Sequence, residues 1–203
     1  MENNIGEAHN ELLTFMMKNH DISTLNTFDK YIEFQYDHLS SQYPELSKYD
    51  KSEFVELVLS TLNSNDISEF DYKESLAITL KRALDSEIVS DTFYSETIRV
   101  LNDESVDGNN IEEKIGSLDA ANEFEKNSIS YFLEIAKSSQ EFWGATDVTA
   151  KRNWVVWGAD AWGGFVAGTL TGTLTVNPVV GYLAGLAGAE LMSACVGAAQ
   201  GHH

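Results

Sequence analysis

The sequence predicts an all-α protein, in which an acidic multi-helix body precedes a C-terminal Gly/Ala-rich helical hairpin. Apolar residues recur at intervals of three and four through the first part of the chain, the spacing that places them on one face of a helix. The 203 residues contain only two prolines, Pro44 and Pro178, so few positions interrupt a helix. Small residues recur every four positions near the C-terminus. We therefore divide the chain into a body, residues 1–145, and a tail, residues 146–200, and expect residues 201–203 to be the remnant of a purification tag.

The body begins with two amphipathic helices. The apolar face of the first is formed by Ile5, Ala8, Leu12, Phe15 and Met16. Phe28, Ile32 and Leu39 mark the second. This helix should end at the segment SSQYP, because a proline disfavours helical geometry in the residue before it.

Two later helices carry start signals. Asp50 and Glu53 have the spacing of a capping box ahead of FVELVLSTL. Asp71 and Glu74 repeat this pattern ahead of SLAITLKRAL. An acidic side chain at each of these positions can accept hydrogen bonds from the first free backbone N–H groups, so we expect a helix to begin at each.

The rest of the body should contain further helices, giving about six in total. A short one is indicated by Phe93, Thr97, Ile98 and Leu101. Another should open at Asn110–Glu113 and end near Gly116. The longest is marked by Ala121, Phe124, Ser128, Phe132, Ile135, Ser139 and Phe142.

The tail allows two interpretations. The segment TLTGTLTV alternates with period two and is rich in β-branched residues, which favours a strand. The small residues instead favour two helices, 154–176 and 179–199, joined by a turn at Asn177–Pro178. We prefer the hairpin, because two facing ridges of small residues allow the close backbone packing that offsets the helix cost of glycine. The facing ridges are Gly164, Gly168, Gly172 on the first helix and Gly181, Gly185, Ala189 on the second.

Charge is confined to the body. The chain carries a net charge of −19, and all 13 Lys and Arg and all but two of the 32 acids lie before Trp154. Such a surface repels phosphate backbones and shows no basic stripe, so nucleic-acid binding is excluded. It also disfavours spontaneous adsorption to anionic lipid.

The tail could be a buried core or a membrane segment. Its two helices would be about 34 and 31 Å long, enough to cross a hydrocarbon core of about 30 Å. Trp154, Trp157 and Trp162 resemble an interfacial belt, whereas Asp160 and Glu190 oppose insertion. We expect the tail to be buried by the body in the soluble form, with membrane insertion as a conditional alternative.

Three polar residues are candidates for burial: His9, Asn10 and Asp160. His9 lies on the apolar face of the first helix, where a packed, hydrogen-bonded histidine is the expected role. A buried Asp160 requires partners, which we expect to be a tryptophan N–H, backbone amides at a helix start, or His9, Asn10 or Arg152. We favour His9, because this pair would tie the first helix to the tail.

The sequence contains no catalytic constellation and no metal or cofactor motif. It has no GxSxG elbow, SxxK pair or phosphate-binding loop, and its single cysteine excludes a cysteine-based metal cluster. The stretch beginning at Asp103 is similar to a calcium loop, but its twelfth position is Lys114 instead of a glutamate. We therefore expect a protein that is not an enzyme and binds no cofactor.

Several short motifs carry a resemblance: GEAHNELL, Phe142-Trp143 and WVVWGADAWGGFVAGT. The chain resembles a group of uncharacterised secreted or lipid-anchored proteins of the Bacteroidota, in which a helical body ends in a Trp-then-Gly/Ala tail. The tail is also similar to glycine-zipper bacteriocins and their two-peptide relatives. These resemblances imply an envelope or extracellular location, with a native leader removed, and membrane or interbacterial action.

Two functions follow from these expectations. The first is a membrane-active, bacteriocin-like protein whose body shields the hairpin. The second is a non-enzymatic envelope protein with a binding or structural role, in which the hairpin is simply the core. The expected partners are membrane lipid or an envelope protein, with self-association through the tail.

Overall fold

The fold is all-α, as predicted. The computed structural model describes residues 4–144, 156–165 and 178–199, and no strand occurs among them. The helices of the body are α1 (Ile5–Asn19), α2 (Asp29–Gln42), α3 (Lys51–Leu59), α4 (Tyr72–Asp85), α5 (Asp91–Asn102), α6 (Ile111–Gly116) and α7 (Glu123–Gly144). Short 3-10 turns interrupt the connections at Ile22–Thr24 (η1), Leu46–Lys48 (η2) and Ile67–Glu69 (η3). In the tail, residues 156–165 are helical, and α9 spans Pro178–Ala199.

Local signals in the sequence set several helix starts. Asp50 accepts hydrogen bonds from the backbone N–H groups of Ser52 (2.8 Å) and Glu53 (3.3 Å) at the start of α3. Asp71 accepts one from Glu74 N–H (3.0 Å) at the start of α4. Both predicted caps are confirmed. The Glu74 side chain does not complete a reciprocal box, because it accepts a hydrogen bond from Asn63 instead.

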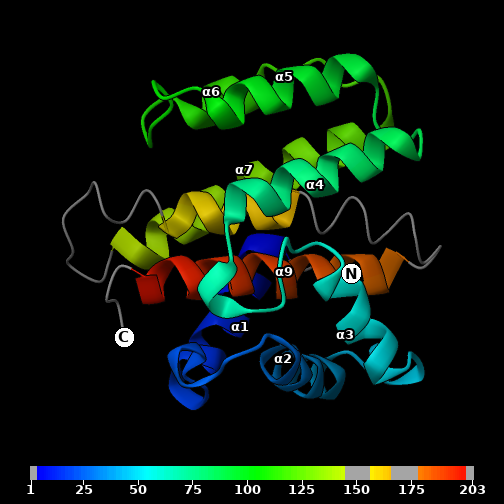
Figure 1. The fold of residues 1–203 in the computed structure, drawn as a ribbon, viewed down its shortest axis with the longest axis vertical. Coiled ribbons are helices and arrows are strands. Elements are labelled where there is room, and N and C mark those ends of the chain that lie inside the picture. The colour runs from blue at the N-terminus through cyan, green and yellow to red at the C-terminus, as the bar shows by residue number, and fades with distance from the viewer. Residues whose placement is uncertain (1–3, 145–155, 166–177, 200–203) are drawn as a thin grey trace.

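The helix α9 crosses the middle of the molecule (Figure 1). It contacts α1, α2 and α3 of the body, and α1 also packs along α7. In the view of Figure 1, α2 and α3 lie on one side of α9, α4 and α7 on the other, and α5 and α6 further out. This apolar helix is therefore surrounded by helices of the acidic body.

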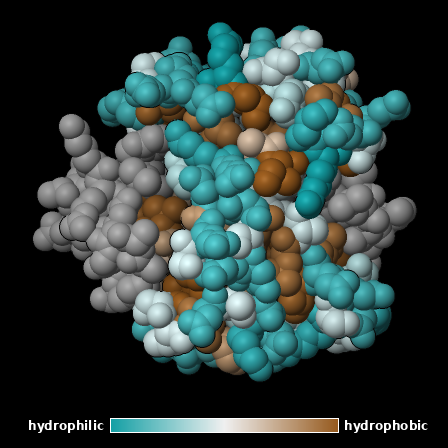
Figure 2. Space-filling model, in the orientation of Figure 1, coloured by the Kyte–Doolittle hydropathy of each residue, from teal (hydrophilic) through white to brown (hydrophobic). Residues whose placement is uncertain are grey.

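Body and tail share one hydrophobic core. The same cluster of buried residues includes Leu12 and Met16 of α1, Phe132 of α7, and Leu183 and Leu186 of α9. Figure 2 shows hydrophilic residues over much of one face, with smaller hydrophobic patches between them. This distribution explains how an acidic exterior and an apolar tail coexist in one chain, since the body turns its apolar faces toward the tail.

Only part of the predicted hairpin lies within the described residues. The second predicted helix, 179–199, is confirmed as α9. The first is helical at 156–165, whereas the segment TLTGTLTV, the turn residue Asn177 and the rest of that arm lie outside the described residues. The choice between helix and strand for that segment therefore remains a prediction.

Candidate functional site

The candidate site is the buried tail, and α9 is its principal element. Among the described residues, one segment, Val179–Gly197, is long and apolar enough to cross a membrane by length and composition, and 78% of it is buried by the rest of the protein. Its 19 residues span about 28 Å as a helix, close to the thickness of a hydrocarbon core. A buried core helix also has these properties, so the polar contacts of the tail are more informative than its length.

Glu190 is the single charged side chain on α9, and α2 holds it. Tyr31 donates a hydrogen bond from its hydroxyl to Glu190 Oε1 (2.7 Å), and Gln35 donates from Nε2 to Glu190 Oε2 (2.6 Å). Gln35 Nε2 also donates to the backbone carbonyl of Ala187 (3.0 Å). Glu190 and Gln35 are fully buried and Tyr31 nearly so. Because Tyr31 and Gln35 are four residues apart, they lie on the same face of α2 and can reach one carboxyl group together.

Burial controls the ionisation of Glu190. The pKa of this carboxyl is raised to about 8, chiefly by removal from water and also by the nearby Asp160, while the hydrogen bonds from Tyr31 and Gln35 act in the opposite direction. The pKa of the Tyr31 hydroxyl is also raised, first by burial and then by Glu190. Burial therefore favours the protonated, uncharged form of Glu190 near neutral pH.

Asp160, in helix 156–165, forms the second polar centre. Trp143 of α7 donates a hydrogen bond from Nε1 to Asp160 Oδ2 (3.1 Å). His9 Nε2 of α1 lies 3.7 Å from Asp160 Oδ1, and both side chains are fully buried. The predicted tryptophan N–H partner is thus confirmed. The predicted pairing with His9 is present as a contact within 4 Å, without a hydrogen bond. Burial raises the pKa of Asp160, and the charge of a protonated His9 opposes this shift.

The contact between His9 and Asp160 is an electrostatic one. At 3.7 Å the two atoms are too far apart for a hydrogen bond, and neither has another hydrogen-bond partner among the described residues. The opposite ring nitrogen, His9 Nδ1, lies 3.2 Å from Asn10 Oδ1 and 3.5 Å from Ser139 Oγ. Asn10, another predicted partner of Asp160, does not bind it. The Asn10 amide donates instead to the backbone carbonyl of Ser138 (2.9 Å). Arg152 lies outside the described residues.

The tryptophans of the tail are part of the core in this form. Trp157 and Trp162 are both buried. The Trp162 ring packs edge-on against Phe132 of α7 and against Phe165, at centroid distances of 5.1 and 5.2 Å. Phe165 stacks on Phe93 of α5 at 5.8 Å. These rings fix helix 156–165 to the body, whereas Trp154 lies outside the described residues.

A close approach of helix 156–165 and α9 depends on a glycine that the predicted ridge did not include. A Cβ atom at Gly163 would lie 2.6 Å from Ala189 Cα and 3.0 Å from the backbone oxygen of Gly188. A Cβ atom at Gly164 would meet the Ala189 side chain at 4.0 Å and would chiefly clash with Ile135 of α7. Gly164 therefore allows the tail to approach α7, and Gly163 allows it to approach α9.

The remaining residues of the predicted ridges divide into two groups. Gly181, Gly185 and Ala189 are buried on α9, as a core position requires. Gly168 and Gly172 lie outside the described residues. Prediction from the sequence missed Tyr31 and Gln35, and it did not specify Trp143 as the tryptophan that binds Asp160. The signal that could have found them is the requirement that a carboxyl group buried in an apolar tail must have polar partners on the helices that cover it.

The described residues also bear on the expectation for a metal site. No group of three or more His, Cys, Asp or Glu side chains there is placed to hold a metal ion. In the stretch that is similar to a calcium loop, Asp103 forms an ion pair with Lys114 at 2.6 Å and accepts hydrogen bonds from Ser105. Its carboxylate is therefore engaged within a turn.

Comparisons with protein-family models, with curated proteins and with solved structures give no match.

Proposed function

We propose that this chain is a secreted or envelope-associated membrane-active protein, similar to bacteriocins, whose helical body shields the tail. One observation carries the proposal: α9 is an apolar helix of membrane-spanning length, enclosed by the body, and its one carboxyl group is fully buried, which raises the pKa of that group to about 8. An ionised glutamate in the middle of a membrane span costs about 3 kcal/mol. Protonation of Glu190 in the closed form removes this obstacle before the tail leaves the body.

Acid is the expected trigger, and it acts on the body. Hydrogen bonds from Ser52 and Ser68 hold the pKa values of Asp50 and Asp66 below their usual range, and the bond from Lys114 does the same for Asp103. Groups of this kind stabilise the fold at pH values above their unfolded pKa, and this contribution is lost as the pH falls through the folded pKa. Acidification below about pH 4 therefore weakens the caps at Asp50 and Asp66, whereas Asp103, whose pKa lies well below its usual range, keeps its ion pair with Lys114.

Acid also reduces the charge barrier between the protein and a membrane. At neutral pH the net charge of −19 repels anionic lipid. Protonation of surface carboxylates near pH 4 lowers this charge. The same change in pH thus loosens the shell and permits contact with the bilayer, where small-residue packing between tail helices would support association, including self-association.

A second function is favoured by the polar contacts that hold the tail. Tyr31 and Gln35 on α2, and Trp143 on α7, fix two buried carboxyl groups of the tail at specific positions. Such contacts are expected of a permanent core. In this alternative the protein is a non-enzymatic envelope protein that binds a partner or has a structural role, and the tail never leaves the body.

Dye release from anionic lipid vesicles distinguishes these functions. We expect little release by the intact protein at pH 7, and substantial release near pH 4 or after limited proteolysis of the body. A matched variant, Asp50→Asn with Asp66→Asn, isolates the contribution of the caps to the acid trigger, since asparagine caps a helix about as well as aspartate but cannot be protonated in this range. Its release should require a lower pH than that of the wild type.

Two controls complete the experiment. Glu104→Asn, at an exposed position, removes one negative charge without removing a cap and should leave the acid threshold unchanged. If intact and cleaved protein both leave vesicles sealed at pH 7 and at pH 4, the membrane-active function is refuted and the envelope function is supported.

A further inference from the structure

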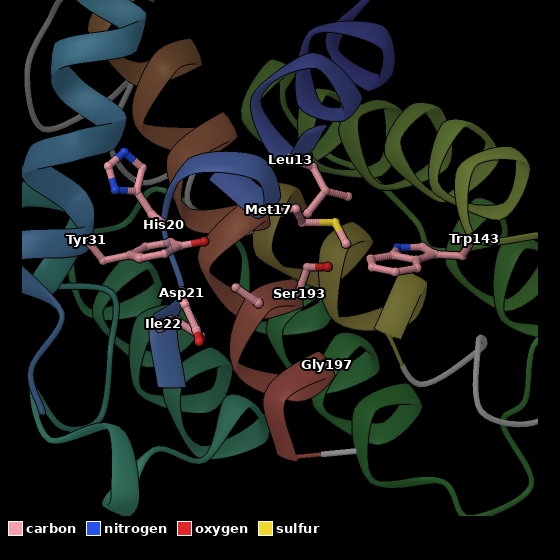
Figure 3. Close-up of a pocket in the computed structure, with 10 residues that line it drawn as sticks. Leu13, Met17, His20, Asp21, Ile22, Tyr31, Trp143, Ser193 and Gly197 are labelled. Atoms are coloured by element: carbon pink, nitrogen blue, oxygen red, sulfur yellow. The ribbon is translucent and has the colours of Figure 1, made fainter. Parts of the chain in front are cut away.

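A cavity of about 260 Å³ lies where α1, η1, α2, α7 and α9 meet. Figure 3 shows the side chains that line it, with Leu13 and Met17 from α1, Tyr31 from α2, Trp143 from α7 and Ser193 from α9. Met17 is 53% exposed, whereas Leu13, Tyr31, Trp143 and Ser193 are buried. The cavity thus extends from the surface into the core of the protein.

Its walls are mostly apolar, with one unsatisfied polar group. Leu13, Met17, Ile22 and the Trp143 ring provide the hydrophobic surface. The Ser193 hydroxyl is 1% exposed and has no partner at hydrogen-bonding geometry among the described residues, although it lies near enough to Asp160 to lower the pKa of that carboxyl. In Figure 3 this hydroxyl points toward Met17 and Trp143, into the space between them. A buried hydroxyl without a partner is costly, so a ligand that supplies one would bind favourably.

We propose that this cavity binds a small neutral amphiphile, an apolar chain that ends in one hydroxyl group. The apolar part would contact Leu13, Ile22 and Met17, and the hydroxyl would pair with Ser193 Oγ. The volume suits such a molecule, because an apolar cavity of about 150 Å³ accommodates benzene and drug-sized sites begin at about 300 Å³. A neutral ligand is favoured over an anion, since Asp21 lines the cavity, Asp160 lies behind Ser193, and the chain is strongly acidic.

The ligand would also stabilise the closed arrangement of the tail. Tyr31 and Trp143 line the cavity and donate the hydrogen bonds that hold Glu190 and Asp160. A molecule that binds only this arrangement shifts the equilibrium toward it by mass action. Binding itself does not depend on the proposed membrane activity, so the two proposals can fail separately.

NMR of methionine methyl groups tests the proposal directly. The chain has four methionines, and of these Met17 lines the cavity, whereas Met16 is fully buried and does not. Titration of methyl-labelled protein with 1-butanol, 1-hexanol and 1-octanol should shift the Met17 signal saturably, with a smaller change at Met16. Affinity should increase about fourfold per added methylene until the chain fills the cavity. A shift that grows linearly without saturation would overturn the proposal.

Two variants and one control locate the site. Ser193→Ala keeps the cavity and removes its hydroxyl, so it should weaken 1-hexanol binding about threefold to tenfold. Ala194→Leu should fill the cavity and abolish saturable binding, whereas Ala121→Leu, at an exposed position, should bind like the wild type. Wild-type affinity in both Ser193→Ala and Ala194→Leu would show that the alcohol binds elsewhere, and the proposal would be wrong. Should Ala194→Leu fail to fold, as judged by circular dichroism, Ser193→Ala alone decides, because this substitution only removes an oxygen atom.

Discussion

The titration of Glu190 should make this protein less stable as the pH rises, opposite to the usual behaviour of a carboxyl group. In the unfolded chain the group ionises near its ordinary pKa of 4.5, whereas in the folded protein burial keeps it protonated up to about pH 8. The folded state therefore binds more protons than the unfolded state between these values. The stabilising effect of the protonated Glu190 carboxyl is fully present below pH 4.5 and is lost as the pH rises through 8.

The magnitude follows from the size of the shift. Each pH unit in this window changes the free energy of unfolding by at most about 1.4 kcal/mol. From pH 4.5 to pH 7 the contribution of Glu190 should therefore decrease by about 3 kcal/mol. This is a large fraction of the stability of an ordinary domain, about 5–15 kcal/mol, so the effect should be measurable.

The variant Glu190→Gln isolates this contribution. A glutamine has nearly the same shape, can accept from Gln35 and donate to Tyr31, and does not titrate. Urea unfolding followed by circular dichroism from pH 5 to pH 9 should show that the difference in unfolding free energy between wild type and variant changes by about 2.5 kcal/mol in favour of the variant between pH 5 and pH 7. Glu104→Gln, at an exposed position, should follow the wild type at every pH.

The groups near Glu190 define what could mask this result. They are Tyr31 on α2, Asp160 in helix 156–165 and Cys195 on α9, and the pKa values of all three are raised by burial. The pKa values of Tyr31 and Cys195 lie above the tested range, so neither contributes a slope below pH 8. A difference between wild type and Glu190→Gln that is constant from pH 5 to pH 9 would refute the reasoning, because it would mean that Glu190 has the same pKa in both states.

Two further substitutions test the packing and the polar contacts of the tail. Gly163→Ala should lower the free energy of unfolding by about 1–3 kcal/mol, because its Cβ would lie 2.6 Å from Ala189 Cα and force helix 156–165 away from α9. Thermal unfolding measures this effect, with Ala121→Gly as the control. An unchanged melting temperature of Gly163→Ala would contradict the close contact. Tyr31→Phe removes only the hydroxyl that donates to Glu190 and should lower the free energy of unfolding by about 1–2 kcal/mol. Because that hydrogen bond lowers the pKa of Glu190, the pH dependence of the urea midpoint should extend to higher pH in the variant. A shift to lower pH would argue against this role of the Tyr31 hydroxyl.

The sequence by itself determined the local structure and the distribution of charge. The carboxylates of Asp50 and Asp71 fix the starts of α3 and α4 through contacts with residues two or three positions away, so their effect can be predicted without knowledge of the fold. The same is true of α9, whose apolar composition requires burial wherever it lies. The need of Asp160 for a polar partner also followed from the sequence, because an unpaired buried charge is too costly.

Only the tertiary structure decided which groups meet. Glu190 is held by Tyr31 and Gln35, which are more than 150 residues away in the chain, and nothing in either local pattern marks them as its partners. Tertiary packing also determines that Gly163 is the point where helix 156–165 comes close to α9. A four-residue repeat shows that a helix has a face of small residues. The rotation and register of two packed helices, however, depend on how all surrounding side chains fill space together, and this is a property of the whole core.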